Sequence, residues 1–393
     1  MIKIFLLSAC LLINAACIYS QDINLILKQV SGNNPEILAY KKLLEARRSE
    51  AVTDLTPPDP VFSFGYMPGN NELSGTKKIW SVNQSFSFPS KYLHQKRISR
   101  STIILAEQEF NLGKLNILLD AKLALLDLIY KKKSLVLLRE RKEGYDTLVK
   151  AWKTLVIHGG GTITDFNKII MEVSSLDLKI NRTEADISML VNRLNYLKGN
   201  NDFLPDTLTY PDFRDVDAET LISEKILGHP SFIIPEKEYL IRKGEAGLSR
   251  TANLPEFQAG YSAEILPGET FAGPVAGLTI PLWANANKIK SASAKEVYSS
   301  VMRDAVLAKL KSEVINESQN LKALKKSIYD LSSILKSGDN KRYLDLALSS
   351  GEISITTYFS DLGIMNEIED RLLELENEYQ KSAASLFDHE LLK

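Results

Sequence analysis

The residue types that most often carry chemistry are present in this chain, but their spacing does not build a site. No pair of histidines has the separation typical of metal ligands; the four are His94, His158, His229 and His389. The glycine run at 159–161 lacks the Lys-Ser/Thr ending of a phosphate-binding loop. No Gly-x-Ser-x-Gly nucleophile motif occurs, and the methionines after residue 20 are isolated. The sequence therefore predicts no catalytic residue, no metal site and no cofactor, and the chain is not expected to be an enzyme.

Residues 1–20 have the pattern of an export signal. A lysine precedes an apolar stretch at 4–13, small residues follow, and cleavage is expected after Ser20. The alternative is a lipoprotein signal, in which Cys17 would become the lipidated first residue. The other cysteine, Cys10, also lies in this segment, so a chain cut after Ser20 has no thiol.

The charge balance excludes some classes of partner. The chain has 48 Lys and Arg against 49 Asp and Glu, and the basic residues are dispersed. Nucleic-acid binding usually needs a basic stripe, so no nucleic-acid partner is expected. After residue 20 no apolar run approaches the roughly 20 residues that a membrane-spanning helix needs. If the chain spans a membrane, it must therefore do so with β-strands.

An internal duplication organises the rest of the chain. Residues 22–66 align with residues 217–261 without a gap, and later landmarks align at an offset of 192 positions. Matched residues include Pro35/Pro230, Gly65/Gly260, Pro89/Pro281, Gly159/Gly351 and Thr164/Thr356. The predicted domains are the signal at 1–20, a first repeat at 21–204, a proline-containing linker at 205–216, and a second repeat at 217–393.

Each repeat is expected to contain a helix, at 35–54 and 230–250, and then a β-hairpin, at about 61–88 and about 256–282. The last strand is expected at 272–282. Large apolar residues alternate with small or polar ones along these strands, as in a transmembrane barrel and also as in an ordinary half-buried sheet. If the strands form a barrel, the expected lipid-facing residues are Phe62, Phe64, Trp80, Val82, Phe86, Phe88, Tyr261, Leu278 and Ile280.

Long helices are predicted after each hairpin. No proline interrupts residues 91–157 or 284–350, and apolar residues recur at steps of three and four, as in coiled coils. A helix of about 65 residues would be roughly 100 Å long. Two similar turns, at 159–166 and 351–358, start with glycine, which ends one helix, and contain Thr or Ser, which caps the next. Each repeat is therefore expected to contain a long antiparallel helical hairpin.

Taken together, these features resemble the TolC-like family of outer-membrane efflux proteins. The resemblance is carried by Asn34-Pro35-Glu36, Pro58-Asp59-Pro60, Gly65-Tyr66, Phe86-Ser87-Phe88-Pro89 and Thr279-Ile280-Pro281-Leu282-Trp283, with the two turns and the duplication. Each motif alone is weak, but their order and spacing are specific and cover nearly the whole chain after the signal. The Gly-Tyr-Met-Pro segment at 65–68 is most similar to the cation-efflux branch.

The resemblance implies a mixed α and β fold. Long α-helical coiled-coil hairpins would form a periplasmic tunnel, and four antiparallel strands per protomer would join a trimeric 12-stranded transmembrane β-barrel. Four strands alone leave two open edges, which lipid does not tolerate, so the protomers must associate. The protein would lie in the outer membrane of a Gram-negative-type bacterium, with a periplasmic helical extension.

The implied function is a passive exit duct of a tripartite efflux system for small molecules or metal cations. The expected partners are two further copies of the chain, a periplasmic adaptor protein, an inner-membrane pump and outer-membrane lipid. In the family the helix turns form a periplasmic tip that opens when docked to the adaptor. The matching residues, which are the expected adaptor contacts, are Gly159, Gly161, Thr164, Asp165, Phe166, Gly351, Ile353, Ser354 and Tyr358.

Asp165 and Asp361 are candidates for an acidic gate, because rings of carboxylates favour cations. For Asp165 the favoured interpretation is instead an acid that suits the positive end of a helix dipole. No capping position singles out Asp361.

Two alternatives fit part of the sequence. A soluble periplasmic scaffold or adaptor-like protein would share the signal and the long helices, but it would not need the aromatic face at Trp80, Phe86 and Phe88. An adaptor would also carry a lipoyl-like hairpin, which this sequence lacks. A duct for polypeptides cannot be distinguished from one for small solutes, because the pump selects the substrate.

Overall fold

The computed structural model describes residues 23–393 apart from 71–74, 200–207, 282–284, 337 and 339. The predicted signal and the first residues of the predicted linker therefore lie outside the described residues. The chain forms two compact units. The sheet unit comprises residues 39–113 and 221–313, and the helical unit comprises the described residues of 1–38, 114–220 and 314–393. Helices α3 (Pro89–Ile157) and α7 (Ala286–Lys336) contribute residues to both.

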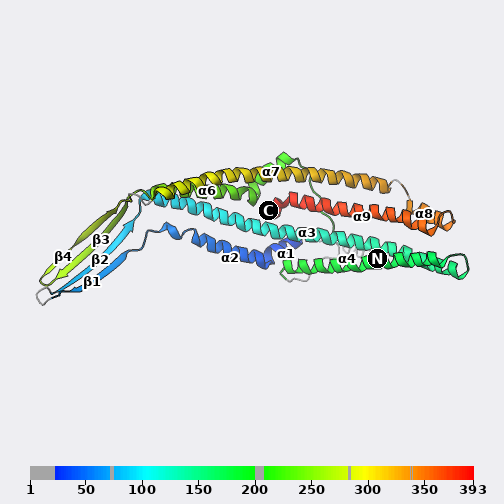
Figure 1. Ribbon diagram of the computed structural model, residues 1–393, viewed down its shortest axis with the longest axis horizontal. Coiled ribbons are helices and arrows are strands. Elements are labelled where there is room, and N and C mark those ends of the chain that lie inside the picture. Colours follow the sequence, from blue (N-terminus) through cyan, green and yellow to red (C-terminus); the bar gives the residue numbers. More distant parts are fainter. Residues whose placement is uncertain (1–22, 71–74, 200–207, 282–284, 337, 339) are drawn as a thin grey trace, which may run out of the picture. The chain divides into compact units, whose positions relative to one another are not determined.

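The sheet unit contains four antiparallel strands in the order β1-β2-β3-β4 (Figure 1). Both predicted hairpins are present, and their strands are β1 (Val61–Pro68), β2 (Thr76–Phe86), β3 (Glu256–Leu266) and β4 (Glu269–Thr279). The last strand was predicted at 272–282, and this is wrong by three residues at each end. Pro267 and Gly268 form a two-residue turn, with Gly268 at a φ of 86°, so β4 begins earlier than predicted. Phe88 and Ile280 lie just beyond the ends of β2 and β4.

Helices α2 (Pro35–Glu50) and α6 (Pro230–Thr251) match the helices predicted at the start of each repeat, although α2 ends four residues early. Each begins with the expected proline, whose missing N–H costs nothing in a first helical turn. In the sheet unit α6 lies very close to α3. A Cβ added at Gly244 would come within 2.6 Å of Ile98, and one at Gly247 within 2.6 Å of His94, so glycine permits this approach.

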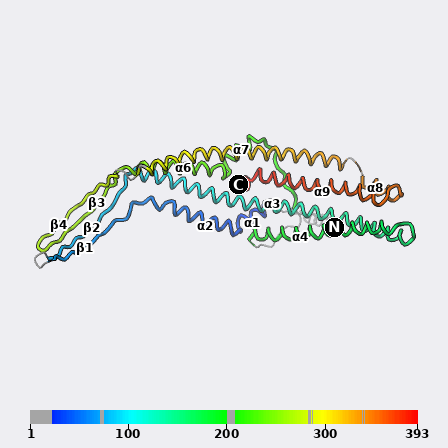
Figure 2. The backbone as a smooth tube through the Cα atoms, in the orientation of Figure 1, coloured from blue at the N-terminus to red at the C-terminus, as the bar shows by residue number. Residues whose placement is uncertain are grey.

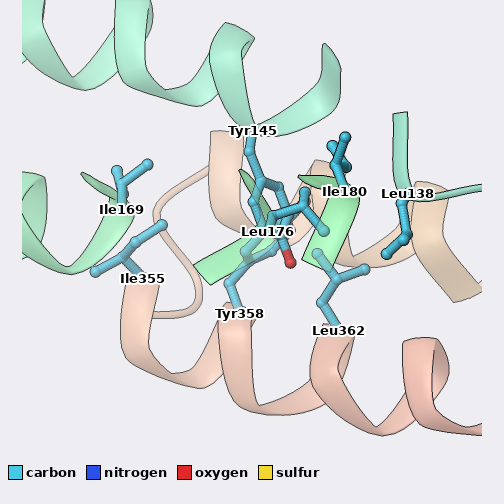
Figure 3. Close-up of a cluster of buried hydrophobic side chains, with 8 residues drawn as sticks. All are labelled: Leu138, Tyr145, Ile169, Leu176, Ile180, Ile355, Tyr358 and Leu362. Carbon is cyan, nitrogen blue, oxygen red and sulfur yellow. The ribbon is translucent and has the colours of Figure 1, made fainter. Parts of the chain in front are cut away.

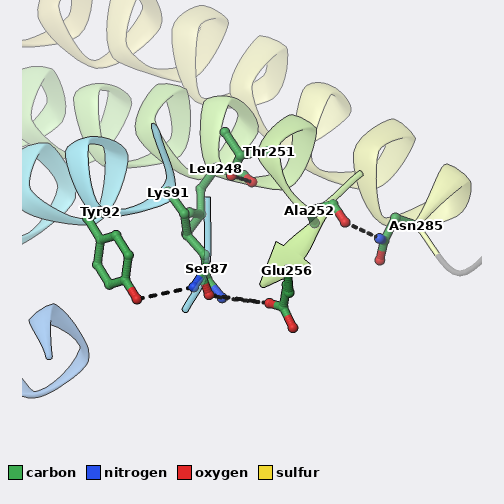
Figure 4. A network of polar contacts seen from close by, with 8 residues as sticks. All are labelled: Ser87, Lys91, Tyr92, Leu248, Thr251, Ala252, Glu256 and Asn285. Carbon is green, nitrogen blue, oxygen red and sulfur yellow. Dashed lines mark hydrogen bonds and ion pairs between the residues drawn. The ribbon is translucent and has the colours of Figure 1, made fainter. Parts of the chain in front are cut away.

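A polar network fixes the sheet to the helices that follow it (Figure 4). The Lys91 ammonium group, in the first turn of α3, donates to the Ser87 hydroxyl at 2.9 Å and lies 3.5 Å from the Glu256 carboxylate at the start of β3. The Ser87 hydroxyl donates to the same carboxylate at 3.3 Å. The Asn285 amide, just before α7, donates to the Ala252 carbonyl at 2.6 Å. Both hairpins are thereby joined to helices at the same end of the sheet.

Both predicted antiparallel helical hairpins are present, and Figure 2 shows their path. In the first, α3 pairs with α4 (Ile163–Leu197) through ion pairs at Lys131–Asp186 and Arg139–Glu184. The buried residues of α4 recur mainly at steps of three and four, the spacing of a coiled coil: Ile169, Leu176, Ile180, Thr183, Leu194 and Leu197. The second hairpin comprises α7, α8 (Asn340–Ser349) and α9 (Ile355–Leu386).

The second long helix is not continuous, contrary to the prediction for residues 284–350. Helix α7 ends at Lys336 and α8 begins at Asn340. Gly338 lies between them, and glycine costs about 1 kcal/mol relative to alanine inside a helix. Three further helical segments were not predicted, namely α1 (Ile23–Asn33), α5 (Ala218–Gly228) and the C-terminal 3₁₀ segment Asp388–Leu392.

The described part of the predicted linker packs against the helical unit. The Phe213 ring stacks on Phe387 with centroids 5.8 Å apart, and the Lys122 ammonium lies 5.1 Å from the Phe213 centroid. The Lys133 ammonium group likewise lies over the Tyr210 ring, 4.4 Å from its centroid. Burial lowers the pKa of Lys122 and raises that of Tyr210. These aromatic and cation–π contacts make the segment a packed part of the fold.

Gly199 supports a first testable prediction. It follows α4 with a φ of 73°, and a Cβ there would lie 2.5 Å from the backbone carbonyl oxygen of Asn33. We expect Gly199→Ala to lower the free energy of unfolding by about 1–3 kcal/mol, because the strained φ and the backbone clash act together. Gly144→Ala is the control, since a Cβ at Gly144 in the middle of α3 meets nothing within 4 Å. Denaturant unfolding should show Gly144→Ala as neutral or stabilising, and an equal loss in both variants would contradict this account.

Candidate functional site

The two glycine turns have the same backbone geometry. Gly159 and Gly351 adopt φ values of 75° and 79°, the left-handed conformation that glycine tolerates best. In the first turn the amide of Gly160 donates to the carbonyl of Leu155 at 2.9 Å, and the amide of Gly159 to that of Val156 at 3.1 Å. The second turn repeats both bonds, from Glu352 to Ala347 and from Gly351 to Leu348, at 2.9 and 3.2 Å. This pair of bonds defines a Schellman motif, so the duplication predicted from sequence extends to the hydrogen bonds.

A hydroxyl residue caps the next helix in both turns. The Thr162 hydroxyl accepts from the amide of Asp165 at 3.1 Å and donates to its carboxylate at 2.7 Å. The Ser354 hydroxyl accepts from the amide of Thr357 at 3.1 Å. Ser354 was among the predicted site residues, whereas Thr164 was selected in the first turn and Thr162 was missed. Thr162, three residues before Asp165, carries the capping-box spacing that identifies the cap.

The caps support a second prediction. We expect Thr162→Ala to lower the stability of the α4 N-terminus by about 1 kcal/mol, because the Asp165 amide loses its acceptor. Thr164→Ala is the matched control, since Thr164 is exposed in the first turn of α4 and is not the cap. Amide hydrogen exchange at residues 163–166 should be faster in Thr162→Ala alone. Equal acceleration in both variants would argue against the cap.

The two turns are joined by a buried apolar cluster (Figure 3). Its members come from α3, α4 and α9: Leu138, Tyr145, Ile169, Leu176, Ile180, Ile355, Tyr358 and Leu362. Tyr358 is buried, and its hydroxyl donates to the Asp345 carboxylate of α8 at 2.7 Å. Burial, followed by this carboxylate, raises the pKa of the Tyr358 phenol above its usual range. The predicted site residue Tyr358 is thus a core residue that ties α8 to α9.

A direct contact also links the two turns. The Lys168 ammonium donates to the Thr356 hydroxyl at 2.6 Å and lies 4.0 Å from the Asp165 carboxylate. Asp165 lies in the first turn of α4. Its carboxylate has two polar neighbours, the capping hydroxyl of Thr162 and the ammonium group of Lys168. Asp361 lies in the second turn of α9 and is exposed. A carboxylate in the first turn of a helix, as at Asp165, suits the positive end of the helix dipole.

The remaining predicted tip residues line the same turns. Phe166 is half-buried on α4, and Ile353 packs against the apolar cluster. A Cβ at Gly161 would lie 3.3 Å from Cβ of Leu155, so this glycine permits close approach. Within the described residues of the two turns, no three His, Asp or Glu side chains converge on one point.

Sequence reasoning missed a set of polar contacts between α3 and α9. The Arg141 side chain is only 8% exposed, and it donates to Asp370 at 2.8 Å, to Glu369 at 3.0 Å and to the Asn366 carbonyl at 3.0 Å. Farther along, Asp127 accepts from the Asn377 amide at 2.8 Å and from the Lys381 ammonium at 3.0 Å. No signal in the sequence pairs these residues, because they are more than 200 positions apart.

The strand register places seven of the nine predicted lipid-facing residues on one side of the sheet, while Phe88 and Ile280 lie beyond the paired strands. Phe62 pairs with Val82 and Phe64 with Trp80, and Val82 and Phe86 pair in turn with Tyr261 and Phe257. We call this side the apolar face. Its large apolar residues are Phe62, Phe64, Tyr66, Trp80, Val82, Phe86, Phe257, Tyr261, Ile265 and Leu278, and its polar residues are Thr76, Lys78, Gln84 and Thr270. Most of the large apolar side chains are exposed to solvent.

The opposite face is more polar. It carries Ser63, Ser81, Asn83, Ser85, Gln258 and Ser262, the charged residues Lys77, Glu256, Glu264 and Glu269, four glycines, and a smaller apolar set that includes Ile79, Phe271 and Val275. Strands β1 and β4 each pair with a single strand among the described residues, so both are edge strands. Pro274 lies in β4, and proline is tolerated in a sheet mainly at an edge.

A four-stranded antiparallel sheet with an exposed apolar face and two long helical hairpins with matching turns is the fold that the TolC-like resemblance predicts. No protein-family model matches the sequence, and no curated protein shows significant similarity to it. No helix among the described residues is long and apolar enough for a membrane crossing.

Solved structures of outer-membrane proteins have a similar fold. CusC has a TM-score of 0.80 with 14% sequence identity, over 93% of this chain and 91% of that one. The outer membrane protein VceC from Vibrio cholerae gives a TM-score of 0.76 with 12% identity, over 94% and 95%. The MtrE outer membrane channel from Neisseria gonorrhoeae, solved in its open state, gives 0.74 with 12% identity, over 93% and 88%. The predicted TolC-like fold is therefore confirmed.

Proposed function

We propose that this chain is the outer-membrane channel of a tripartite efflux system, and that it acts as a homotrimer. Four strands from each protomer would close a 12-stranded barrel in the outer membrane, and the helical hairpins would line a periplasmic tunnel. Small molecules or metal cations, delivered by an inner-membrane pump through a periplasmic adaptor, would leave through this duct without chemical change. The structural similarity to outer-membrane channels supports this proposal.

The observation that carries the proposal is the sheet. Its apolar face is exposed, and its two edge strands have unpaired backbone groups. In water such a surface is an aggregation hazard. In lipid the apolar face is favourable, but the open edges are not. Pairing β4 of one copy with β1 of the next satisfies both requirements, and three copies give a barrel wide enough for a channel.

The matching turns are the proposed contact with the adaptor. They combine exposed backbone at Gly159 and Gly351 with a rigid support, because the caps and the apolar cluster hold both turns. An acidic ring at Asp165 or Asp361 would favour cations. The Lys168 contact weakens this idea for Asp165, since it compensates part of the negative charge.

The test is fractionation of the native host, followed by gel electrophoresis of the outer-membrane fraction with and without boiling. We expect a species that requires detergent and changes from trimer to monomer mass on heating. Recovery in the soluble periplasmic fraction without detergent would instead favour the periplasmic scaffold. Intact mass of the same sample would show whether the chain starts after Ser20 or at a lipidated Cys17.

A further inference from the structure

The sheet unit contains a cavity of about 490 Å³ between the end of α2, one face of α3 and α6. The volumes of sites for drug-sized molecules are about 300–1,000 Å³. Every lining residue belongs to the same compact unit. The apolar part of the wall consists of Leu55, Ile98, Leu105, Ala106 and Leu248. The cavity is therefore large enough for a small organic molecule, and it needs no second chain to form.

Two polar groups of α3 line this cavity without hydrogen-bond partners. The amide oxygen of Gln95 is buried and accepts no hydrogen bond from the described residues. One turn farther along, Ser99 is only 6% exposed, and its hydroxyl makes no hydrogen bond to a described residue. Buried polar groups are almost always hydrogen-bonded. The Gln95 oxygen requires a donor, and the Ser99 hydroxyl can accept as well as donate, so the cavity suits a ligand with N–H groups.

The cavity also carries negative charge without a counter-ion. The carboxylates of Glu50 and Asp54 line it, and neither has a cationic partner among the residues that the structure describes. Arg47 lines it too, but its guanidinium already pairs with the Glu109 carboxylate of α3. Helix α2 ends at Glu50, so the negative end of its dipole adds to the charge of the carboxylates. This combination favours a cation.

The second repeat lacks this charge. In the duplication Arg47 and Glu50 align with Arg242 and Glu245, and those two residues pair with each other at 2.8 Å. At the position of Asp54 the second repeat has a serine. In the first repeat the arginine instead pairs with α3, which leaves Glu50 without a counter-ion. The uncompensated carboxylates are therefore a feature of this cavity and not of the repeated unit.

We propose that the cavity binds an amphipathic organic amine in its protonated form. The ammonium group donates to the Gln95 amide oxygen and the Ser99 hydroxyl, while Glu50 and Asp54 supply the compensating charge. The apolar body of the amine lies against the apolar part of the wall. The carboxylates reject an anion, and an uncharged apolar molecule would leave the polar groups of α3 without partners. Because the cavity forms within one chain, amine binding does not depend on the proposed trimer.

The test is a fluorescence titration of the full chain, in a non-ionic detergent, with dansylcadaverine, a dye that carries a primary ammonium group. Its N-acetyl derivative keeps the dye and the alkyl chain but has no charge, and micelles without protein give the background. We expect saturable binding of one amine per chain, at least about tenfold tighter than binding of the N-acetyl derivative, because a charge-assisted hydrogen bond is lost on acetylation. Equal affinities for the two probes would refute the proposal.

Two exposed carboxylates can be neutralised with little risk to folding. The double variant Glu50→Gln/Asp54→Asn should bind the amine about three- to tenfold more weakly and leave binding of the N-acetyl derivative unchanged. Added salt should reduce the difference between this variant and the unmodified chain. Glu45→Gln is the matched control, since Glu45 lies on the same helix but pairs with Lys42 and does not line the cavity. Equal losses in the control and the double variant would argue against the site.

Gln95→Leu distinguishes a ligand site from a packing defect. Removal of a buried acceptor that has no partner should leave the free chain at least as stable in denaturant unfolding. The amine should nevertheless bind at least about tenfold more weakly. An unchanged affinity for the amine in this variant would overturn the proposal.

The unboiled gel of the same samples separates this proposal from the proposed channel. A trimer that binds no amine would refute the site and leave the channel proposal standing. A chain that is monomeric in detergent and binds the amine would contradict the channel and support the site.

Discussion

Replacing Val82 by arginine is expected to deplete the heat-sensitive outer-membrane trimer that we propose. Val82 lies in the middle of β2 on the apolar face, between Phe62 and Tyr261. An arginine facing lipid near the bilayer midplane costs about 2–4 kcal/mol, and a trimer carries this cost three times. The measurement is the fraction of trimer that survives on an unboiled gel of the outer-membrane fraction. We expect this fraction to fall at least about tenfold, since each 1.4 kcal/mol is a factor of ten.

Ser81→Arg is the matched control for this prediction. Ser81 is the preceding residue of β2 and faces the opposite side, where it pairs with Ser63 and Ser262. If the polar face lines the lumen, the trimer should survive and the single-channel conductance in a planar bilayer should fall, because a bulky cation narrows the pore. A trimer lost with Ser81→Arg but retained with Val82→Arg would reverse the proposed faces.

Replacing Arg141 by alanine should have the largest effect in the helical unit. Its guanidinium is buried and joins α3 to three groups of α9. Breaking a fully buried pair costs about 3–5 kcal/mol. Glu369 and Asp370 are 36% and 42% exposed and can be rehydrated, so we expect a loss of about 2–3 kcal/mol. The measurement is hydrogen exchange in α9 residues 366–374, which should lose protection while the turn at 351–354 changes less.

The neighbouring residue provides a control for Arg141. Lys142 pairs with Asp177 of α4 at the surface, and this bond raises the pKa of Lys142. Lys142→Ala should cost about 0–1 kcal/mol, and added salt should reduce the difference from the unmodified chain. Arg141→Lys should recover only part of the loss, because an ammonium group cannot match the forked contacts of a guanidinium. Equal effects of the two alanine substitutions would mean that the Arg141 contacts add nothing beyond an ordinary surface ion pair.

Local signals in the sequence determined most of the secondary structure. The prolines at 35 and 230 mark the starts of α2 and α6, and the glycines at 159 and 351 mark the turns, because these residues restrict or extend the backbone irrespective of distant neighbours. Alternation along the strands also predicted which residues share a face, since side chains in a strand alternate with a period of two. The predicted residues Phe62, Trp80 and Tyr261 do lie on one face.

The same reasoning erred where several weak signals compete. It extended the last strand to 282 and the second long helix across Gly338. Strand ends and helix breaks depend on differences of about 1 kcal/mol, which neighbouring contacts can reverse.

Only the tertiary structure decided which helix faces are covered. Helices α4 and α9 follow the same kind of turn and have a similar heptad pattern. Asp370 and Lys381 of α9 nevertheless contact Arg141 and Asp127 of α3, whereas Leu178 and Met189, 192 positions earlier on α4, remain exposed. Likewise, the sequence predicted an alternating apolar face but not the register that pairs Val82 with Tyr261 across two repeats. Helical and strand periodicities are properties of neighbouring residues, while the partner of a face is set by residues more than 150 positions away. The sequence by itself therefore determined the elements and their apolar sides, and the packed structure decided which of those sides are buried and which stay exposed.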